Sequence, residues 1–403
     1  MIKRFLNERC FGPEFGRQMR FVTGPRQCGK TTIAREHLKL THCADSYFNW
    51  DKREVRSLFR QDNYFYRKAA GAGKPFSWVC FDEIHKMPKW KNILKDFFDS
   101  DEKKYRFIIT GSARMDLLRK AGDSLAGRYF TFRLFPLSLA ELAGGGAARS
   151  FPEKTPAQFL EKKLSSSPKS AGTMSQLLAL SGYPEPFLSG SAAFSNKWRS
   201  GYLDLLVRED LRDLTHIAEL ENISALMGLL PSKISSPLSL NSLREDLEVS
   251  YNAVKSYLKA LELGYVVFSL PPYSTRVARS VKKERKFYFY DWTRPATEAS
   301  RFENYAAVEL KMLVSLWEDF GLGHFELHYV RTRDGFETDF LITRDNLPYI
   351  LFEAKLSDSA LPPHNKKHAM LLGDVPLVLL TKQDGVASAG EGGYHISASR
   401  LFA

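Results

Sequence analysis

Eight residues near the start of the chain have the types and the spacing of a phosphate-binding loop. The segment GPRQCGKT, residues 24–31, matches the pattern G-x-x-x-x-G-K-[ST] at every fixed position. Glycines let backbone N–H groups wrap around phosphates, the lysine reaches the β and γ oxygens, and the last hydroxyl is a ligand for Mg²⁺. We therefore predict a nucleoside triphosphate site rather than a plain glycine-rich turn, with Lys30 acting in binding and catalysis and Thr31 on the metal. The predicted nucleotide-binding residues of this loop are Gly24, Pro25, Arg26, Gln27, Cys28, Gly29, Lys30, Thr31 and Thr32.

Two adjacent acids supply what hydrolysis of that nucleotide would need. In SWVCFDEIH, Asp82 and Glu83 directly follow an apolar run, at the C-terminal end of an expected strand. Asp82 would meet the Mg²⁺ through water, and Glu83 is placed to orient or deprotonate an attacking water. A buried strand that ends in surface acids has the same pattern, but its combination with the phosphate loop favours hydrolysis.

Further polar residues are candidates to sense the γ-phosphate or to neutralise charge in the transition state. Thr110 and Ser112 stand at the end of the expected strand in FIITGSA, and either could sense the γ-phosphate. Arg114 and Arg128 are candidates for the neutralising cation, although arginines in surface salt bridges are common, and we favour Arg128. If Arg128 acts on a neighbouring copy of the chain, the enzyme must form a homo-oligomer.

A second set of residues, near the end of the chain, has the pattern of a metal-dependent nuclease. Glu353 and Lys355 lie two apart in an apolar run, so on a strand they point to one face. A centre of the PD-(D/E)XK type needs an acid on one strand and acid-x-lysine on the next, often with a glutamate on the preceding helix. Asp339, Glu353 and Lys355, with Glu303 before them, occur in that order. Asp339 and Glu353 would hold Mg²⁺ or Mn²⁺, and Lys355 would orient water or stabilise the developing charge.

Nuclease activity is one of three interpretations of these residues. Lys355 could simply neutralise the acids at a sheet edge, or the fold could retain only the ability to hold DNA or a protein. Because short acidic motifs arise often by chance, the residue types leave an active and an inert centre open.

The phosphate loop requires a strand before it and a helix after it, and the first 143 residues provide such an alternation. The pattern predicts an α/β fold with a parallel sheet covered by helices on both faces. Helical spacing occurs in residues 31–40 and 90–98. The expected strands are residues 19–23, 46–51, 76–83, 105–112 and 129–137.

Four domains follow from the pattern along the chain. They are a P-loop domain over 1–143, a linker with helices over 144–221, a winged helix over 222–272 and a nuclease-like domain over 273–403. For the winged helix we expect three short helices and a strand pair within 265–274. Its third helix should begin after Ser250 and end before Gly264, with Val254, Tyr257, Leu258 and Leu261 buried.

The expected order in the last domain is that of a restriction-endonuclease-like α/β core. A helix over 303–320 is followed by strands over 325–332, 336–342 and 349–356, then a helix over 364–372 and a strand over 375–381. A turn over 344–346 joins the second and third strands as a hairpin. This hairpin should bring Asp339 beside Glu353.

The charge balance favours a polyanion as partner. The 58 Lys and Arg residues exceed the 46 Asp and Glu residues, which gives a net charge of +12. The basic run RVARSVKKERK, residues 276–286, would add salt-dependent phosphate contacts. We favour DNA over a protein partner, although winged helices also serve as lids or protein docks. The exposed residues of the third helix expected to contact phosphates and groove edges are Tyr251, Asn252, Lys255, Ser256 and Lys259.

Cysteine usage and hydropathy predict a cytoplasmic protein that binds no membrane. The four cysteines lack CxxC spacing and are typical of reduced thiols. The first residues, MIKRFLNERC, lack the apolar run of a signal peptide, and no stretch approaches the roughly 20 apolar residues of a membrane helix.

Several of these motifs together resemble a bacterial and archaeal group of AAA-type ATPases. The segments GPRQCGKTT, FDEIH, TGSA, SGYPEP and YLDLLVREDLRDL carry the resemblance to its ancestral-type AAA domain. FENYAAVEL, ETDFLI and FEAKLS are similar to its C-terminal domain of unknown function, although many members have an aliphatic residue at the position of Thr338. The resemblance implies a Mg²⁺-dependent ATPase with a catalytic glutamate, adenine as the base, and the TGSA strand between the other two motif strands.

Two functional hypotheses follow. The first is an ATPase that binds DNA and acts in DNA transactions, with a C-terminal domain that could be an active nuclease. The second is a nucleotide-dependent switch that binds a protein partner, with the C-terminal domain as an inert recognition module.

Overall fold

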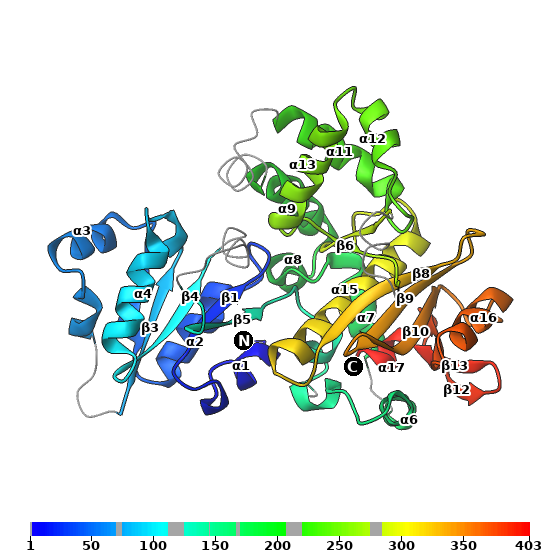
Figure 1. Cartoon of the computed structure of the whole chain (residues 1–403), viewed down its shortest axis with the longest axis horizontal. Helices are drawn as coiled ribbons and strands as arrows, with labels where there is room; N and C mark the ends of the chain where they lie inside the picture. Colours follow the sequence, from blue (N-terminus) through cyan, green and yellow to red (C-terminus); the bar gives the residue numbers. More distant parts are fainter. Residues whose placement is uncertain are drawn as a thin grey trace. The chain divides into compact units, whose positions relative to one another are not determined.

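The computed structural model describes residues 2–69, 75–111, 125–144, 146–166, 170–206, 220–274 and 284–403. The chain forms two compact units (Figure 1). The N-terminal unit is Lys3–Phe135, and the C-terminal unit comprises Pro136–Ala403 with the first two residues. The division at Phe135 comes earlier in the chain than the expected boundary at 143.

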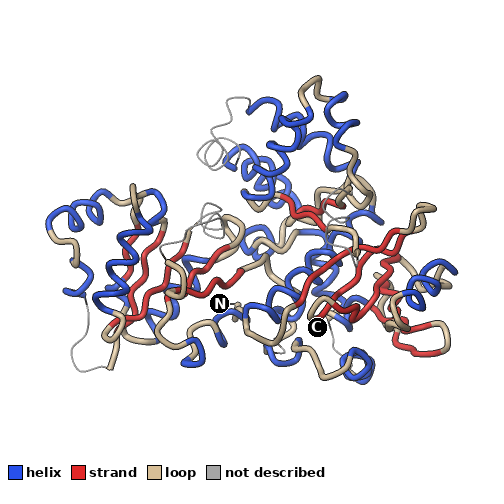
Figure 2. The backbone as a smooth tube through the Cα atoms, viewed as in Figure 1, coloured by secondary structure: helices blue, strands red, loops and turns tan. Residues whose placement is uncertain are grey.

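The N-terminal unit is built on a five-stranded sheet in which every pair of neighbours is parallel. The strand order is β2-β3-β4-β1-β5. Figure 2 draws the strands of this sheet in red and the helices beside them in blue. The five predicted strands are confirmed, and β4 lies between β3 and β1 as the family resemblance implied. The strand bounds are β1 Met19–Thr23, β2 Tyr47–Asn49, β3 Ser77–Asp82, β4 Tyr105–Thr110 and β5 Tyr129–Arg133.

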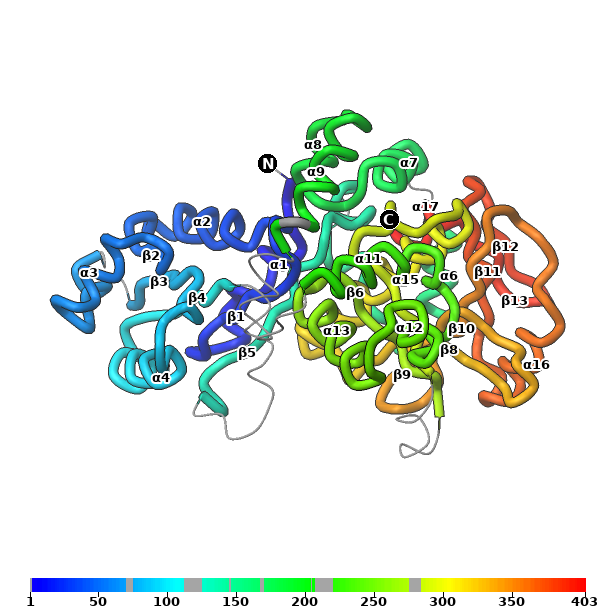
Figure 3. Tube along the Cα trace, turned by 90° about the horizontal axis from the view of Figure 1, so that it is seen from above, coloured from blue at the N-terminus to red at the C-terminus, as the bar shows by residue number. Residues whose placement is uncertain are grey.

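Helices cover both faces of this sheet, with α2 and α4 on opposite sides (Figure 3). Aromatic side chains dominate the core on one of these faces, where Phe81 stacks against Phe107 and contacts the rings of Tyr66 and Phe97. Such rings bury large apolar areas and add edge-to-face attraction, so they anchor the strand that carries Asp82. The helix bounds are α1 Phe5–Arg9, α2 Lys30–Leu40, α3 Arg53–Gln61 and α4 Trp90–Asp101, with 3₁₀ turns Pro13–Phe15, Ala44–Ser46, Phe65–Ala69 and Ile84–Lys86.

The C-terminal unit begins with a series of short helices. Two of them start with capping boxes, at Ser138 and Thr155. A third starts with Pro184 in its first turn, where the missing backbone N–H of proline costs no helical hydrogen bond. The helix bounds are α5 Leu139–Leu142, α6 Pro156–Ser165, α7 Ala171–Leu180, α8 Pro184–Ser189 and α9 Ala192–Leu205, with a 3₁₀ turn at Ala147–Ser150.

Three further helices, α11 Leu220–Lys233, α12 Leu240–Asp246 and α13 Tyr251–Leu263, lead into a short antiparallel pair, β6 Val267–Leu270 and β7 Lys286–Phe289. The predicted third helix is confirmed. The Ser250 side chain accepts from the backbone N–H of Ala253, Gly264 is the C-cap, and the predicted apolar stripe is buried.

The strand pair expected within 265–274 is wrong in its second member. β6 pairs with β7, which comes much later in the chain and which the sequence placed in the last domain. An isolated bridge between Pro237 and Lys286 extends this pair on its other side. Strand pairing is non-local, so the apolar run over 265–274 did not reveal its true partner.

The last sheet has six strands in the order β12-β13-β11-β10-β9-β8. The predicted hairpin between β9 and β10 is confirmed, and its turn residues Asp345 and Asn346 both have positive φ, as a tight two-residue hairpin turn requires. The long helix α15 Glu298–Asp319 packs on β8, β10 and β7. The other bounds are β8 Phe325–Arg331, β9 Glu337–Arg344, β10 Leu347–Lys355, α16 Pro363–Leu371, β11 Leu377–Thr381, β12 Ala387–Gly390, β13 Gly393–Ser397 and α17 Ala398–Leu401.

The mixed α/β fold class, with a parallel sheet followed by helices and a second sheet, is therefore confirmed. Among the described helices, none combines the length and the apolar character needed to span a bilayer.

Candidate nucleotide site and acidic centre

The predicted phosphate loop runs from the end of β1 into the start of α2. Gly24 and Gly29 have φ of 138° and 103°, values that glycine adopts readily and other residues rarely. At Gly24 a Cβ would lie 2.0 Å from the carbonyl oxygen of Leu134, so the position has no room for a side chain. The buried Lys30 ammonium donates to the carbonyl oxygens of Gly24 at 2.9 Å and Pro25 at 2.7 Å, which holds it over the loop.

The buried side chain of Arg4 holds this loop in place. The Arg4 guanidinium donates to the Cys28 carbonyl oxygen at 2.8 Å and to the Phe135 carbonyl oxygen at 2.6 Å. It thereby ties the middle of the loop to the segment that follows β5. Sequence reasoning missed Arg4, because nothing in the charged start of the chain distinguishes it from its neighbours.

Asp82, at the end of β3, gathers hydroxyl groups from three elements. Thr31 of α2 donates to its Oδ2 at 3.0 Å, and Thr110 of β4 donates to its Oδ1 at 2.5 Å. The Tyr47 hydroxyl of β2 donates to Oδ2 as well. The parallel register sets Asn49, Asp82 and Thr110 level with one another, so the ends of three neighbouring strands meet at this carboxylate.

Tyr47 is a member of this site that the sequence did not reveal. Its pKa is raised above the ordinary value by burial and by its hydrogen bond to the Asp82 carboxylate, so the phenol stays protonated and donates. The Arg35 guanidinium lies 4.2 Å from the centre of its ring. A tyrosine in the strand neighbouring β3 was the available signal, but it becomes informative only once the strand order is known.

Glu83 occupies a left-handed conformation with φ of 58°, unusual for a residue with a side chain. Burial, followed by the nearby Asp82 charge, raises the pKa of Glu83 to about 7. His85 Nε2 lies 3.4 Å from its carboxylate, and Lys86 Nζ lies 4.0 Å away. A carboxylate with a pKa near neutrality, next to the proposed metal ligand, has the properties of a general base.

The remaining nucleotide-site candidates fall into two groups. Ser112 and Arg114 lie outside the described residues. Arg128 precedes β5, and its carbonyl oxygen accepts from the Met19 N–H at the start of β1. It also forms a two-point ion pair with Asp99, at 2.7 and 3.0 Å.

Arg128 therefore lies at the N-terminal end of the strands, whereas the phosphate loop lies at their C-terminal end. A strand of five residues spans about 17 Å, so Arg128 does not stand beside the phosphate loop of its own chain. Its predicted action on a neighbouring copy stays a prediction.

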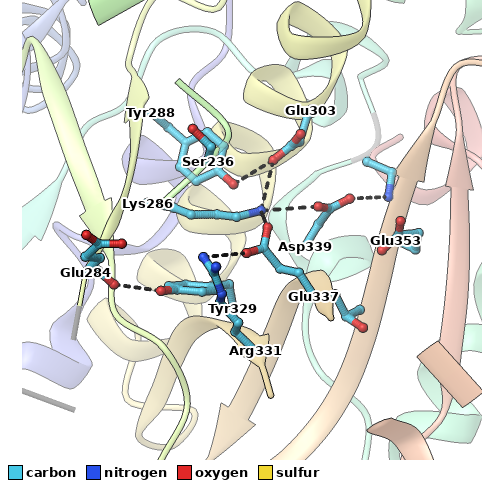
Figure 4. Close-up of polar contacts among 12 residues, drawn as sticks. Ser236, Glu284, Lys286, Tyr288, Glu303, Tyr329, Arg331, Glu337, Asp339 and Glu353 are labelled. Atoms are coloured by element: carbon cyan, nitrogen blue, oxygen red, sulfur yellow. Dashed lines mark hydrogen bonds and ion pairs between the residues drawn. The ribbon is translucent and has the colours of Figure 1, made fainter. Parts of the chain in front are cut away.

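The predicted nuclease residues lie close together, and the β9–β10 hairpin brings Asp339 within electrostatic reach of Glu353 and Lys355, as predicted. A lysine that the prediction did not include stands among the acids. Glu303 of α15 and Asp339 of β9, together with Glu337, surround the ammonium of Lys286 (Figure 4). The distances from Lys286 Nζ are 2.6 Å to Glu337, 3.3 Å to Asp339 and 3.5 Å to Glu303. The Tyr288 hydroxyl donates to Glu303 at 2.8 Å. We call Lys286, Glu303, Glu337 and Asp339 the acidic centre.

Electrostatics explain how these groups share a buried site. Burial alone would lower the pKa of Lys286, but Tyr288 and the surrounding carboxylates raise it well above its ordinary value. Burial and the Asp339 charge raise the pKa of Glu303 to about 8. The surrounding carboxyl groups therefore favour the charged form of Lys286, and burial together with the Asp339 charge favours the protonated form of Glu303.

Glu353 and Lys355 pair with each other, at 2.7 Å between Oε1 and Nζ. Asp339 instead accepts from the backbone N–H of Ala354 at 3.0 Å. Nowhere in the described part of the chain do three or more His, Cys, Asp or Glu side chains form a group suited to a metal ion.

The expectation that the basic run over 276–286 contacts phosphates is wrong for Lys286. Its side chain is 1% exposed, because β7 carries it into the interior next to α15 and β9. Residues 276–283 of the same run lie outside the described residues. The predicted exposure of one face of α13 is confirmed for Tyr251, Asn252, Lys255, Ser256 and Lys259.

Comparisons with known proteins agree with part of this description. Residues 16–143 match the family model of an AAA domain, and residues 172–293 match that of a domain of unknown function, DUF8612. An uncharacterized protein of Mycobacterium tuberculosis is 25% identical over 336 residues, which cover 81% of this chain and 68% of that protein. An uncharacterized protein of Haemophilus influenzae is 24% identical over 319 residues, covering 72% of this chain and 74% of that protein.

Two solved structures are similar at a lower level. The Aeropyrum pernix Orc1 protein in complex with DNA has a TM-score of 0.30 and 12% identity, covering 72% of this chain and 86% of that chain. DnaA of Aquifex aeolicus bound to AMPPCP has a TM-score of 0.30 and 13% identity, covering 64% of this chain and 85% of that chain. The nucleotide-binding, P-loop character of the N-terminal unit rests on the AAA match and on the loop geometry.

The raised pKa of Glu83 gives a testable pH dependence. If the ionised carboxylate accepts the proton of water, kcat/KM for ATP should rise about tenfold per pH unit below pH 7 and level off above it, because that ratio reports the free enzyme. Initial rates at pH values from roughly 5.5 to roughly 9, which bracket this pKa, would measure the rise. A flat profile across pH 7 would contradict the assignment.

Proposed function

We propose that the N-terminal unit binds ATP with Mg²⁺ and hydrolyses the terminal phosphoanhydride bond. The observation that supports this most strongly is the meeting of Thr31 and Asp82, 3.0 Å apart, beside the lysine of a phosphate loop. A hydroxyl and a carboxylate are hard oxygen donors of the kind that Mg²⁺ prefers, so these two residues fit the ion. Bound there, Mg²⁺ would neutralise charge on the phosphates.

Each residue of the site has a role that follows from its contacts. Lys30 exchanges the carbonyl oxygens of Gly24 and Pro25 for the β and γ phosphate oxygens, which are stronger partners for an ammonium. Thr110 and Tyr47 hold the Asp82 carboxylate in place, and Thr31 and Asp82 would hold the metal ion, whose positive charge would offset that of the phosphates. Glu83 orients water and takes up its proton as the new P–O bond forms.

A pair of substitutions separates binding from hydrolysis. We expect Lys30→Ala to lose most of the affinity for ATP. Glu83→Gln should still bind ATP, but its kcat should fall by a factor of roughly 10²–10⁴, the usual contribution of general base catalysis. Phosphate release and equilibrium binding of a fluorescent ATP analogue measure the two effects.

Lys39→Ala, on the exposed side of the last turn of α2, is the matched control and should behave as the wild type. Unchanged ATP turnover in Lys30→Ala would refute the proposed site.

We further propose that the C-terminal unit binds DNA through the exposed face of α13. The order α11, bridge strand at Pro237, α12, α13, β6, β7 supports the winged-helix interpretation, in which the third helix enters a groove. Lys255 and Lys259 project from this face, and the chain carries a net charge of +12. DNA binding that couples to ATP turnover would make the protein an ATPase of DNA transactions.

Salt dependence gives a quantitative test of the DNA contacts. If Lys255 and Lys259 each contact a phosphate, the double variant Lys255→Ala/Lys259→Ala should reduce the slope of log Kd against log salt by about 1.8. Fluorescence anisotropy with labelled duplex DNA measures this slope. The control is Lys95→Ala on the exposed side of α4.

The alternative is a nucleotide-dependent switch that binds a protein, and the exposed Tyr251 together with the Lys259–Glu262 ion pair at 3.3 Å favours it. ATP turnover indifferent to DNA, together with a stable complex with a protein partner, would support this alternative over DNA binding.

A further inference from the structure

We propose that Lys286 is a built-in cation that stands where a nuclease of this fold would hold its metal ion. In this chain the acidic centre is therefore a metal-independent clasp, which fastens the β6–β7 hairpin to the sheet of the C-terminal unit. The inference is independent of ATP hydrolysis and of DNA binding by α13.

The first support is the match between the donors and the acceptors. An ammonium has three N–H donors, and Lys286 is within 3.5 Å of three carboxylates, from α15 and from two positions of β9. Its side chain is almost fully buried, so water does not replace these partners. Figure 4 shows the lysine reaching from β7 into the space between the three acids.

The second support is the charge balance of the acidic centre. The positive charge of Lys286 is joined by that of Arg331, whose Nη1 lies 3.8 Å from Glu337. Glu303 also accepts from the Tyr288 hydroxyl at 2.8 Å. Two cations and a hydroxyl donor thus face the three carboxyl groups of the acidic centre, which reduces its need for a divalent ion.

The third support is that the other acid required by the nuclease pattern has its own lysine. Glu353 pairs with Lys355 at 2.7 Å, whereas Asp339 pairs with Lys286. A Mg²⁺ ion binds carboxylate oxygens at about 2.0–2.1 Å and would have to displace an ammonium tethered among them. Asp339 and Glu353 therefore each have an ammonium group beside them, and a metal ion shared by the two acids would have to compete with both lysines.

The clasp also explains how the hairpin is fixed. Lys286 is the first residue of β7 and forms the bridge to Pro237. Tyr329 of β8 binds both ends of the connection between β6 and β7. Its backbone pairs with Pro271 and Tyr273, and its hydroxyl donates to the Glu284 carbonyl oxygen at 2.6 Å. The Tyr329 ring also lies 5.7 Å from the Lys286 ammonium.

The test is calorimetric unfolding of the full chain with MnCl₂ and with EDTA. Wild-type protein without nucleotide should unfold at the same temperature in both. Lys286→Met should lower the transition of the C-terminal unit by about 10 °C, since it leaves buried acids without their cation. Lys367→Met, at an exposed position of α16 in the same unit, is the matched control and should leave the transition unchanged.

A second variant covers the case in which Lys286→Met does not fold. Glu337→Gln removes the partner at 2.6 Å and leaves two other acids on the lysine, so it should fold with a smaller loss. The double variant Lys286→Met/Glu337→Gln should unfold at a higher temperature than Lys286→Met alone, because it leaves one fewer buried carboxylate without a partner.

Three outcomes would overturn the proposal. The first is that Mn²⁺ raises the unfolding temperature of the wild-type protein but not that of Asp339→Asn. The second is Mn²⁺-dependent DNA cleavage that Asp339→Asn abolishes. The third is a Lys286→Met protein that is as stable as the wild type.

Discussion

The carboxylate of Asp82 is the point on which the nucleotide site depends. It stands at the end of a fully buried strand and accepts hydroxyl groups from β2, β4 and α2. A buried charge must be compensated by such donors or by a cation, because its desolvation is costly. In the proposed function, the same arrangement of three elements around Asp82 would prepare it to accept Mg²⁺ together with Thr31.

The two units solve one physical problem in different ways. Both surround buried carboxyl groups with partners from neighbouring elements. In the N-terminal unit the compensation comes from neutral hydroxyls, which can rearrange when a cation enters. In the C-terminal unit it comes from Lys286, a cation already fixed to the chain. The first arrangement suits reversible binding of a metal nucleotide, and the second suits permanent attachment of one segment to another.

Local patterns predicted the elements that carry the candidate nucleotide site well. The phosphate loop, the Asp82–Glu83 pair and the five strands of the first sheet are encoded in short segments, and the structure has them at the expected positions. The exposed and buried faces of α13 also followed from helical spacing alone. In each case the chemistry and the element that presents it lie within a few residues of one another.

The missed residues are those whose role depends on long-range pairing. Tyr47 reaches Asp82 because β2 neighbours β3, and Arg4 supports the phosphate loop from a distant part of the sequence. Lys286 resembled one more cation in a basic run, yet its strand pairs with β6 and turns it into the interior. The acids of the nuclease pattern and Lys355 were found in the right order, but the sequence did not show that Lys286 lies among three acids.

The most direct measurement of the central claim is the dependence of ATP affinity on Mg²⁺ in wild-type protein and in Asp82→Asn. If Asp82 and Thr31 form the metal pocket, wild-type protein should bind ATP more tightly with Mg²⁺ than with EDTA, and Asp82→Asn should lose most of that difference while still binding the metal-free nucleotide. An equal gain from Mg²⁺ in both proteins would contradict the account.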